Sequence, residues 1–134
     1  MKTVKAIDSS ALVKFFSREE GWKKVEEEIL KGTVSLDISI KEVANALWKK
    51  ALNKEVELGD AEEILRDLIK SETIKIKNQD DYLLAALKLA VENKITIYDS
   101  LYIELAKNIN AELVTSDHTQ AKVARKEGIE TKIV

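Results

Sequence analysis

The chain alternates short runs of β-branched residues with longer segments whose apolar residues recur at helical spacing. The runs typical of strands cover residues 4–7, 33–36, 74–76, 111–115 and 130–134. Helical patterns fill the intervals between them, in the order β-α-α-β-α-α-β-α-α-β-α-β. Strands separated by helices favour a parallel sheet with helices on both faces. We therefore predict an α/β fold of three layers, α/β/α, with a mostly parallel central sheet of four to five strands.

The apolar spacing also predicts which side of each helix faces the core. Four helices are expected near residues 40–51, 59–69, 80–92 and 98–108. In the same order, the residues we expect to face inward are Ile40, Val43, Ala44, Leu47 and Ala51; Ile64, Leu65, Leu68 and Ile69; Leu83, Leu84, Leu87 and Val91; and Leu101, Tyr102, Leu105 and Ala106. Gly32 and Gly128 are expected to end the helices that precede them.

A chain of 134 residues has the usual size of one domain, and we predict a single domain over residues 1–134. The absence of Cys excludes disulfides, zinc ribbons and thiol nucleophiles. No stretch approaches the ~18 consecutive apolar residues of a membrane span, and the N-terminal segment is too charged for a signal peptide. We expect a cytoplasmic protein with no membrane partner.

The balance of charges bears on nucleic-acid binding. Twenty-two basic and 24 acidic residues give a formal net charge of −2. Proteins that hold nucleic acid by bulk electrostatics are normally basic. A nucleic-acid role for this chain therefore requires a local basic patch, or a metal ion that offsets the acids.

Acidic residues follow the ends of several predicted strands. Asp8, Asp37 and Asp117 come just after strands, and Asp99 opens a helix after a short apolar stretch. In an open parallel sheet, ligands bind beyond the carboxyl ends of the strands. However, Asp is also a favoured residue at helix N-termini, and Asp117 with Gln120 is close to a capping box. Location alone does not separate these two interpretations.

Glu42 lies early in its helix, about 200° around the helix axis from Ile40, at ~100° per residue. It is therefore outside the apolar stripe. One interpretation is an ordinary solvated Glu, which the helix dipole favours near an N-terminus. The alternative is that this second face of the helix borders a cleft.

Several carboxylates close together raise one another's pKa unless a cation offsets their charge. A divalent ion with oxygen ligands is the usual solution, and such a site suits phosphodiester cleavage. Other chemistries have little support in the sequence. His118 is the only His, which excludes a His-rich zinc site. Neither Gly-rich phosphate-binding pattern is present, nor a G-x-S-x-G nucleophile motif.

Four segments of the chain resemble the motifs of the PIN-domain nucleases, particularly the VapC-type toxins of toxin–antitoxin pairs. In chain order they are Ala6-Ile7-Asp8-Ser9-Ser10-Ala11-Leu12-Val13-Lys14, Glu42-Val43-Ala44-Asn45-Ala46-Leu47, Thr96-Ile97-Tyr98-Asp99-Ser100-Leu101-Tyr102-Ile103-Glu104-Leu105-Ala106, and Leu113-Val114-Thr115-Ser116-Asp117. Each motif alone is weak, but four in the family's order span nearly the whole chain. The sequence departs from the family in having His118 where a Lys is common and no Pro before Glu42.

This resemblance implies a three-layer PIN-like domain and a metal-dependent endoribonuclease, as in the toxin of a VapBC-type pair. It implies that Asp8, Glu42, Asp99 and Asp117 form an acidic quartet that binds Mg²⁺ or Mn²⁺ and carries the catalysis. Ser9 and Thr115 would be supporting hydroxyls. The implied partners are an RNA substrate, a VapB-like antitoxin and a second copy of the chain in a homodimer. Asp37 is left as a bystander.

Two other functions stay open at this point. One is a PIN scaffold that binds RNA or a protein without cutting. The other is a phospho-accepting receiver domain, although that fold wants adjacent acids after the first strand. Basic residues that could contact phosphates are Lys14, Arg18, Lys49, Lys50 and Lys54, and aromatic residues that could serve interfaces or the core are Phe15, Phe16, Trp22 and Trp48.

Overall fold

The structure is a computed structural model that describes residues 4–134. Its strands are β1 (Lys5–Ile7), β2 (Thr33–Leu36), β3 (Ile74–Lys77), β4 (Leu113–Thr115) and β5 (Thr131–Ile133). Its helices are α1 (Ser9–Phe16), α2 (Trp22–Leu30), α3 (Ile38–Leu52), α4 (Leu58–Lys70), the short 3-10 helix η1 (Gln79–Tyr82), α5 (Leu83–Asn93), α6 (Ile97–Asn108) and α7 (His118–Lys126). The first three residues, part of the segment judged too charged for a signal peptide, lie outside the described residues.

The order of elements along the chain is as predicted, with η1 as the addition. Within residues 4–134 the strands form one five-stranded sheet in the order β3-β2-β1-β4-β5. Every neighbouring pair is parallel, and Ala6 of β1 is in register with Val34 of β2 and Leu113 of β4. The predicted α/β fold with a parallel sheet of four to five strands is confirmed.

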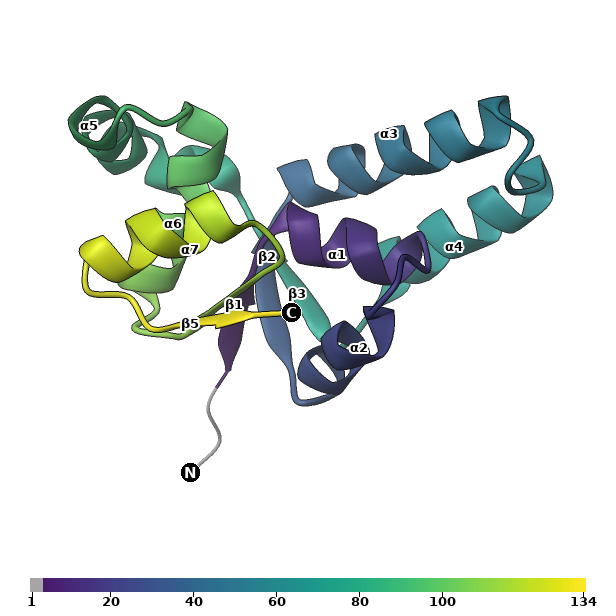
Figure 1. The fold of residues 1–134 in the computed structure, drawn as a ribbon, viewed down its shortest axis with the longest axis horizontal. Helices are drawn as coiled ribbons and strands as arrows, with labels where there is room; N and C mark the ends of the chain where they lie inside the picture. Colours follow the sequence, from purple (N-terminus) through teal and green to yellow (C-terminus); the bar gives the residue numbers. More distant parts are fainter. Residues whose placement is uncertain (1–3) are drawn as a thin grey trace.

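Two apolar cores lie on the two faces of the sheet because successive strand residues point to opposite sides. On β1, Ala6 belongs to the core beneath α5, α6 and α7, while Ile7 belongs to the core beneath α1 to α4. Leu113 and Val114 of β4 divide in the same way. Figure 1 shows the resulting three layers, with α5 to α7 on one side of the sheet and α1 to α4 on the other.

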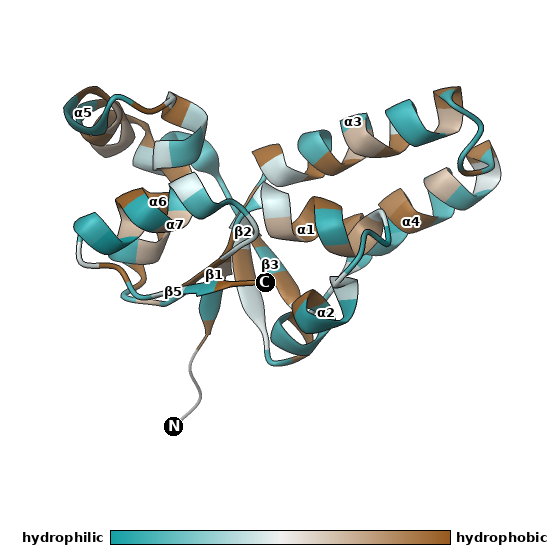
Figure 2. Cartoon of the chain, in the orientation of Figure 1, coloured by the Kyte–Doolittle hydropathy of each residue, from teal (hydrophilic) through white to brown (hydrophobic). Residues whose placement is uncertain are grey.

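The apolar face predicted for the helix near residues 80–92 is wrong. Leu83, Leu84, Leu87 and Val91 are 44%, 87%, 56% and 71% exposed, whereas Ala86, Leu89 and Ala90 are buried. The smaller residues allow α5 to pack closely against α6, and the larger ones remain on the outside. In Figure 2 brown, apolar segments are visible on α5 at the outer limit of the molecule. Ile69, also predicted to face inward, is 59% exposed.

Local signals explain where several helices start and stop. Gly32 and Gly128 have φ angles of 97° and 82°, a conformation that glycine adopts without strain, and each follows a helix as predicted. The helix expected from Asp80 instead begins as η1, because the Asn78 side chain accepts a hydrogen bond from the Asp80 N–H and caps this turn. None of the helices within residues 4–134 combines the length and apolarity needed to cross a membrane.

The sheet has a topological switch point between β1 and β4. From β1 the chain moves outward through β2 and β3, and then it returns across the sheet to β4, beside β1, and continues to β5. Crevices at such points, outside the carboxyl ends of the strands, are where open α/β sheets bind ligands. The residues that follow β1 and β4 are therefore the first place to look for a functional site.

Candidate active site

Asp8 lies directly after β1 and caps the N-terminus of α1. Its Oδ1 accepts hydrogen bonds from Ser10 Oγ at 2.6 Å and from the Ala11 N–H at 3.1 Å, and its Oδ2 accepts one from Thr115 Oγ1. The residue is only 3% exposed. Burial raises the pKa of Asp8 to about 6; the hydrogen bonds oppose this rise, and the negative charge of Asp117 adds to it.

Two hydroxyl groups connect Asp8 to the loop after β4. Thr115 Oγ1 donates to Asp8 and accepts a hydrogen bond from the Asp117 N–H at 3.0 Å. Ser10 Oγ donates to Asp8 and accepts one from the Ser116 N–H at 2.9 Å. The two loops at the switch point are therefore held together by side chains that also orient the Asp8 carboxylate.

Asp117 and Asp99 approach the same place from α7 and α6. Asp117 caps α7, where its Oδ1 accepts hydrogen bonds from the N–H groups of Thr119 and Gln120 at 2.9 and 3.1 Å. Asp99 lies in the first turn of α6, whose cap is Thr96. Burial and, second, the charge of Asp117 raise the pKa of Asp99 above its ordinary value. Capping thus explains the position of Asp117 and Asp8, but not that of Asp99.

Glu42 reaches this region from the N-terminal half of α3. Its Oε2 accepts a hydrogen bond from Ser9 Oγ at 2.9 Å, and its Oε1 accepts one from the Tyr102 hydroxyl at 3.2 Å. Tyr102 is 2% exposed, and burial, followed by the charge of Glu42, raises the pKa of the phenol well above its ordinary value. The phenol therefore stays protonated and remains a donor to Glu42. The off-stripe face of α3 does border a cleft.

All four predicted acids line one cavity of about 1020 Å³ at the carboxyl edge of the sheet. The cavity also includes the hydroxyl, amide and basic residues Ser9, Ser10, Lys14, Lys41, Asn45, Tyr102, Ser116 and Gln120. Within residues 4–134, none of the four acids has a Lys or Arg nitrogen within ion-pair distance. The four acids are therefore not neutralised by direct ion pairs, and Lys14 and Lys41 are the basic residues that share the cavity with them.

Of the basic residues predicted to contact phosphates, Lys14 lines this cavity, and its Nζ donates to the Val134 carbonyl at 3.0 Å. The others do not line it. Arg18 lies over the Trp22 ring, 4.1 Å from its centroid, and Lys50 pairs with Glu55 at 3.7 Å. Asp37 does not line the cavity either. Its Oδ1 accepts a hydrogen bond from the Gln79 N–H at 3.0 Å. Its assignment as a bystander agrees with this geometry.

Three residues of the site were missed in the sequence. The motif after Asp8 contains two adjacent serines, and the family resemblance singles out Ser9 alone. In the structure Ser9 donates to Glu42, and Ser10 donates to Asp8. Tyr102 was assigned only to the core, since its helical position predicts burial but not the hydrogen bond of its hydroxyl. Gln120 was considered only as part of a cap.

The side chains fit a hydrated divalent ion better than a dehydrated one. Among residues 4–134, no three His, Asp or Glu side chains converge closely enough to hold a metal ion by themselves. Mg²⁺, however, usually keeps several waters and is bound through one or two carboxylates. Four carboxylates outside any ion pair among residues 4–134, with pKa values raised at Asp8 and Asp99, supply oxygen ligands and a charge that such an ion would offset.

Known proteins with similar sequences are nucleases by name. Ribonuclease VapC3 of Pyrobaculum aerophilum is 29% identical over 119 residues, which cover 87% of this chain and 91% of that protein. Exonuclease VapC9 of the same organism is 32% identical over 111 residues, covering 83% and 78% of the two chains.

Solved structures share the fold. The crystal structure of PAE2754 from Pyrobaculum aerophilum has a TM-score of 0.69 at 27% identity and covers 98% of this chain and 92% of that one. VapC20 of Mycobacterium tuberculosis, a toxin that cleaves the sarcin-ricin loop, has a TM-score of 0.67 and covers 90% and 94%; at 10% identity the likeness concerns the fold alone. The sequence pattern of the PIN domain matches residues 5–126, nearly the full length. The chain therefore belongs to the PIN domain family.

Proposed function

We propose that this protein is a metal-dependent endoribonuclease and the toxin of a VapBC-type toxin–antitoxin pair. The observation that supports this most is the gathering of Asp8, Glu42, Asp99 and Asp117, from four separate elements, on one cavity, with none of them in an ion pair with a Lys or Arg of residues 4–134. The names of the relatives VapC3 and VapC9 support nuclease activity. Membership in the PIN family argues against the receiver-type alternative. We keep the prediction of a single domain over residues 1–134 that acts in the cytoplasm.

In this proposal Asp8, Asp99 and Glu42 hold Mg²⁺ or Mn²⁺ directly or through water, and Asp117 completes the pocket or orients the attacking water. An ion held there would supply activation of a water molecule and charge stabilisation of the leaving oxyanion. Ser9 and Tyr102 fix the Glu42 carboxylate through both of its oxygens.

Two further groups of residues complete the machinery. Ser10, on α1, and Thr115, on β4, each donate a hydrogen bond to the Asp8 carboxylate and so fix its orientation. Lys14 and Lys41, which also line the cavity, are placed to contact the phosphates of an RNA strand. Their positive charges would orient the RNA backbone without reading its bases.

A circular RNA distinguishes the proposed activity from the alternatives, because an exonuclease needs an end. We expect cleavage of both linear and circular RNA in Mn²⁺ and none in excess chelator. Asp99→Asn should abolish it, whereas the matched control Asp37→Asn, at an Asp outside the cavity that bonds the Gln79 N–H, should not. Cleavage of linear RNA only would indicate an exonuclease, the activity named for VapC9. Binding without cleavage would favour a non-catalytic scaffold, and cleavage that survives both chelator and Asp99→Asn would contradict the metal mechanism.

We also propose that the protein forms a homodimer and that α5 supplies part of the interface. Its outer face carries Leu83, Leu84, Leu87 and Val91, each at least 44% exposed. Exposed apolar patches of this kind mark interaction sites in soluble proteins. Light scattering after size exclusion should report a dimer that Leu84→Glu converts to a monomer. A dimer unaffected by Leu84→Glu would place the interface elsewhere.

The proposed antitoxin partner can be tested separately from the dimer. In a VapBC-type pair, the antitoxin tail would cover the acidic cavity, so its binding should inhibit RNA cleavage and protect the residues around Asp8 and Asp99 from hydrogen exchange. The test uses the product of the neighbouring reading frame, purified with this protein. A product that binds and leaves cleavage unchanged would contradict the toxin–antitoxin assignment but not the nuclease.

A further inference from the structure

Trp48, on α3, carries the most exposed aromatic ring in the described part of the chain. It is 59% exposed, whereas large aromatic residues are usually mostly buried. The indole lines a hollow of about 200 Å³ between α3 and α4, which Leu58 and Leu65 of α4 also line. Leu52, one helical turn further on, is exposed as well. Because α3 packs against α4, this apolar surface is displayed on a helical hairpin, and such surfaces mark interaction sites.

Trp48 lies on the same face of α3 as two residues of the acidic cavity. Lys41, Asn45 and Trp48 follow the i, i+4, i+7 spacing that places side chains on one face of a helix. Of these, Lys41 and Asn45 line the cavity. Trp48 comes about 4.5 Å beyond Asn45 along the helix axis, at ~1.5 Å per residue. Because α3 begins just after β2 and runs outward beside α4 (Figure 1), Trp48 lies on the way out of the cavity.

The charge of α3 is opposite to that of the whole chain. The helix carries three lysines, Lys41, Lys49 and Lys50, and one acid, Glu42, a net charge of +2 in a chain of −2. Lys50 pairs with Glu55 at 3.7 Å, whereas Lys41 and Lys49 are exposed and form no ion pair within residues 4–134. A local basic patch is what nucleic-acid binding requires of a chain with a negative net charge, and α3 supplies one.

Single-stranded RNA is the ligand that these features fit best. Unpaired bases stack on exposed aromatic rings, while lysines bind the neighbouring phosphates. The bases of a duplex are already stacked on one another and offer no free face to Trp48. A protein partner would use the apolar hollow between α3 and α4, but lysines are depleted at protein interfaces. The basic charge of α3 and its continuity with the acidic cavity therefore favour RNA over a protein.

We propose that Trp48 stacks on a base of single-stranded RNA that leaves the acidic cavity along α3, and that Lys49 contacts a neighbouring phosphate. This inference rests on the proposed ribonuclease function and adds to it the path of the strand and the form of the RNA. Since every base has a π-face, stacking adds affinity with little preference for sequence. Trp48 is a binding residue in this proposal, so its loss should raise the KM of cleavage and leave kcat unchanged.

The test measures binding of a fluorescently labelled single-stranded RNA of about ten nucleotides by anisotropy, on the full chain in excess chelator. Trp48→Leu keeps an apolar side chain but removes the ring, and we expect it to weaken binding about tenfold. In Mn²⁺ the KM of cleavage should rise by a similar factor. Trp48→Phe keeps a smaller ring and should retain most of the affinity. Leu58→Ser, the matched control, makes the same hollow polar and should leave the RNA affinity unchanged.

Lys49 is tested by the dependence of binding on salt. Lys49→Gln should reduce the slope of log affinity against log salt concentration by about 0.7, the value for one phosphate contact of a single strand. Lys24→Gln removes another exposed lysine, on α2, and should leave this slope unchanged.

The fluorescence of Trp48 gives an independent measurement of stacking. The chain has two Trp residues, so Trp22→Phe leaves Trp48 as the reporter. Saturating single-stranded RNA should quench this fluorescence, and inorganic polyphosphate, an anion without bases, should not. Fluorescence that RNA leaves unchanged at saturation would overturn the stacking of a base on Trp48.

The possible results separate this inference from the function on which it rests. If the wild-type chain neither binds nor cleaves RNA, both are overturned. If it cleaves RNA in Mn²⁺ and Trp48→Leu has the same affinity and KM, only the present inference fails. It also fails if a duplex binds as tightly as the single strand, or if Leu58→Ser weakens binding as much as Trp48→Leu. A change of oligomeric mass in Trp48→Leu with RNA affinity intact would assign Trp48 to a protein interface instead. Should Trp48→Leu not fold, Lys49→Gln and the fluorescence of Trp48 decide the question.

Discussion

Strand β1 joins two groups of acidic residues that differ in their counter-charges. Lys5 starts the strand and binds Glu28, whereas Asp8 follows its other end and lies in the acidic cavity. Both acids are buried, Glu28 at 0% and Asp8 at 3% exposure. Yet the pKa of Glu28 is lowered to about 2, while that of Asp8 is raised to about 6. Two carboxylic acids with almost no exposure to solvent thus have pKa values shifted in opposite directions.

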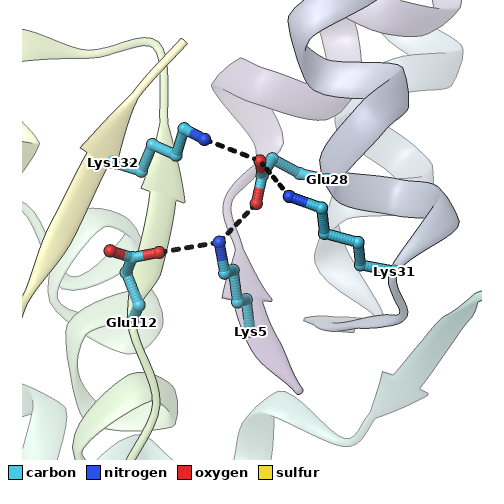
Figure 3. Close-up of polar contacts among 5 residues, drawn as sticks. All are labelled: Lys5, Glu28, Lys31, Glu112 and Lys132. Carbon is cyan, nitrogen blue, oxygen red and sulfur yellow. Dashed lines mark hydrogen bonds and ion pairs between the residues drawn. The ribbon is translucent and has the colours of Figure 1, made fainter. Parts of the chain in front are cut away.

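At the amino end of the sheet, three lysines surround Glu28. Figure 3 shows Lys5, Lys31 and Lys132 pointing toward its carboxylate, and their Nζ atoms lie 2.6, 3.5 and 2.9 Å from its oxygens. Glu112 holds Lys5 from the other side, at 2.9 Å. Burial alone would raise the pKa of Glu28, but the hydrogen bonds and charges of Lys5 and Lys132 outweigh it. This cluster joins α2 to β1 and β5.

At the carboxyl end, hydroxyl and amide groups orient the acids without neutralising them. Hydrogen bonds from Ser10, Thr115 and the Ala11 N–H fix Asp8 but do not overcome burial and the charge of Asp117. Glu28, which holds elements together, is thus in direct ion pairs with lysines, whereas none of the four cavity acids is in an ion pair among residues 4–134. The difference agrees with a structural role for Glu28 and with the proposed ligand-binding role of the four cavity acids.

The largest expected effect comes from removing the charge of Asp8. Asp8→Asn should reduce RNA cleavage at least about a hundredfold, because in the proposed mechanism several kcal/mol of charge stabilisation at the reacting phosphate depend on an ion that Asp8 would help to hold. The same change should stabilise the metal-free fold at pH 7, since raising a carboxyl pKa from 3.8 to about 6 corresponds to about 3 kcal/mol of unfavourable ionisation. Cleavage rates and urea unfolding in chelator measure the two effects. If Asp8→Asn lost stability as well as activity, the charge of Asp8 would stabilise the fold as that of Glu28 does, and the contrast between the two acids would be wrong.

Removing Glu28 should have the opposite pattern. Glu28→Gln is expected to lower the free energy of unfolding by about 2–3 kcal/mol. The change removes the carboxylate whose pKa the lysines lower from 4.5 to about 2, and with it the favourable interaction between the opposite charges. Cleavage per folded molecule should be unchanged. Glu27→Gln, at the neighbouring exposed position of α2, is the matched control and should have little effect on unfolding. A loss of activity in folded Glu28→Gln would show that the two ends of the sheet are coupled.

Asp8 and Glu28 should also differ in how they make the stability of the fold depend on pH, and this effect is smaller than those of the two substitutions. The folded pKa of Asp8 lies above its unfolded value, so its favourable contribution is present below about pH 4 and is lost as the pH rises through about 6. The folded pKa of Glu28 is lowered, so its contribution is present above about pH 4.5 and is lost as the pH falls toward 2. In chelator, the wild-type chain should gain about 1 kcal/mol relative to Asp8→Asn between pH 7 and pH 5. Urea titrations at pH 7 and pH 5 measure the free energy of unfolding of the wild-type chain and of Asp8→Asn. If both gained the same amount of stability, the gain would come from a group other than Asp8.

The order of strands and helices could be predicted because β-branched runs and helical spacing are local signals. The inner face of α5 could not, since both of its faces are apolar: Leu84 and Leu87 form one stripe, and Ala86, Leu89 and Ala90 another. Helical periodicity does not say which of the two stripes packs against α6. The choice depends on how closely α5 approaches α6, which is a property of the tertiary packing.

The position of the acids was predictable, and their connections were not. Strand ends and motif order placed Asp8 and Asp99 at one edge. The hydroxyl of Tyr102 and the amide of Gln120 reach the site across long sequence separations, to Glu42 and to the Asp99 carbonyl. Such contacts leave no local pattern. The lysines around Glu28 were equally hidden, because Lys132 lies 104 residues away from it.

The smallest expected effect tests whether burial or the number of lysines sets the strength of the Glu28 cluster. Lys31 is the most exposed of the three, at 59% of its side chain, and its Nζ is the farthest from Glu28. An exposed ion pair at this i, i+3 spacing contributes little, so Lys31→Gln should lower the free energy of unfolding by less than about 0.5 kcal/mol. Lys5, at 19% exposure and 2.6 Å, should matter more, and Lys5→Gln is the comparison variant. Urea unfolding at low and high salt measures both. If the two changes had equal effects, the Glu28 cluster would depend on total charge and not on the desolvated contact with Lys5.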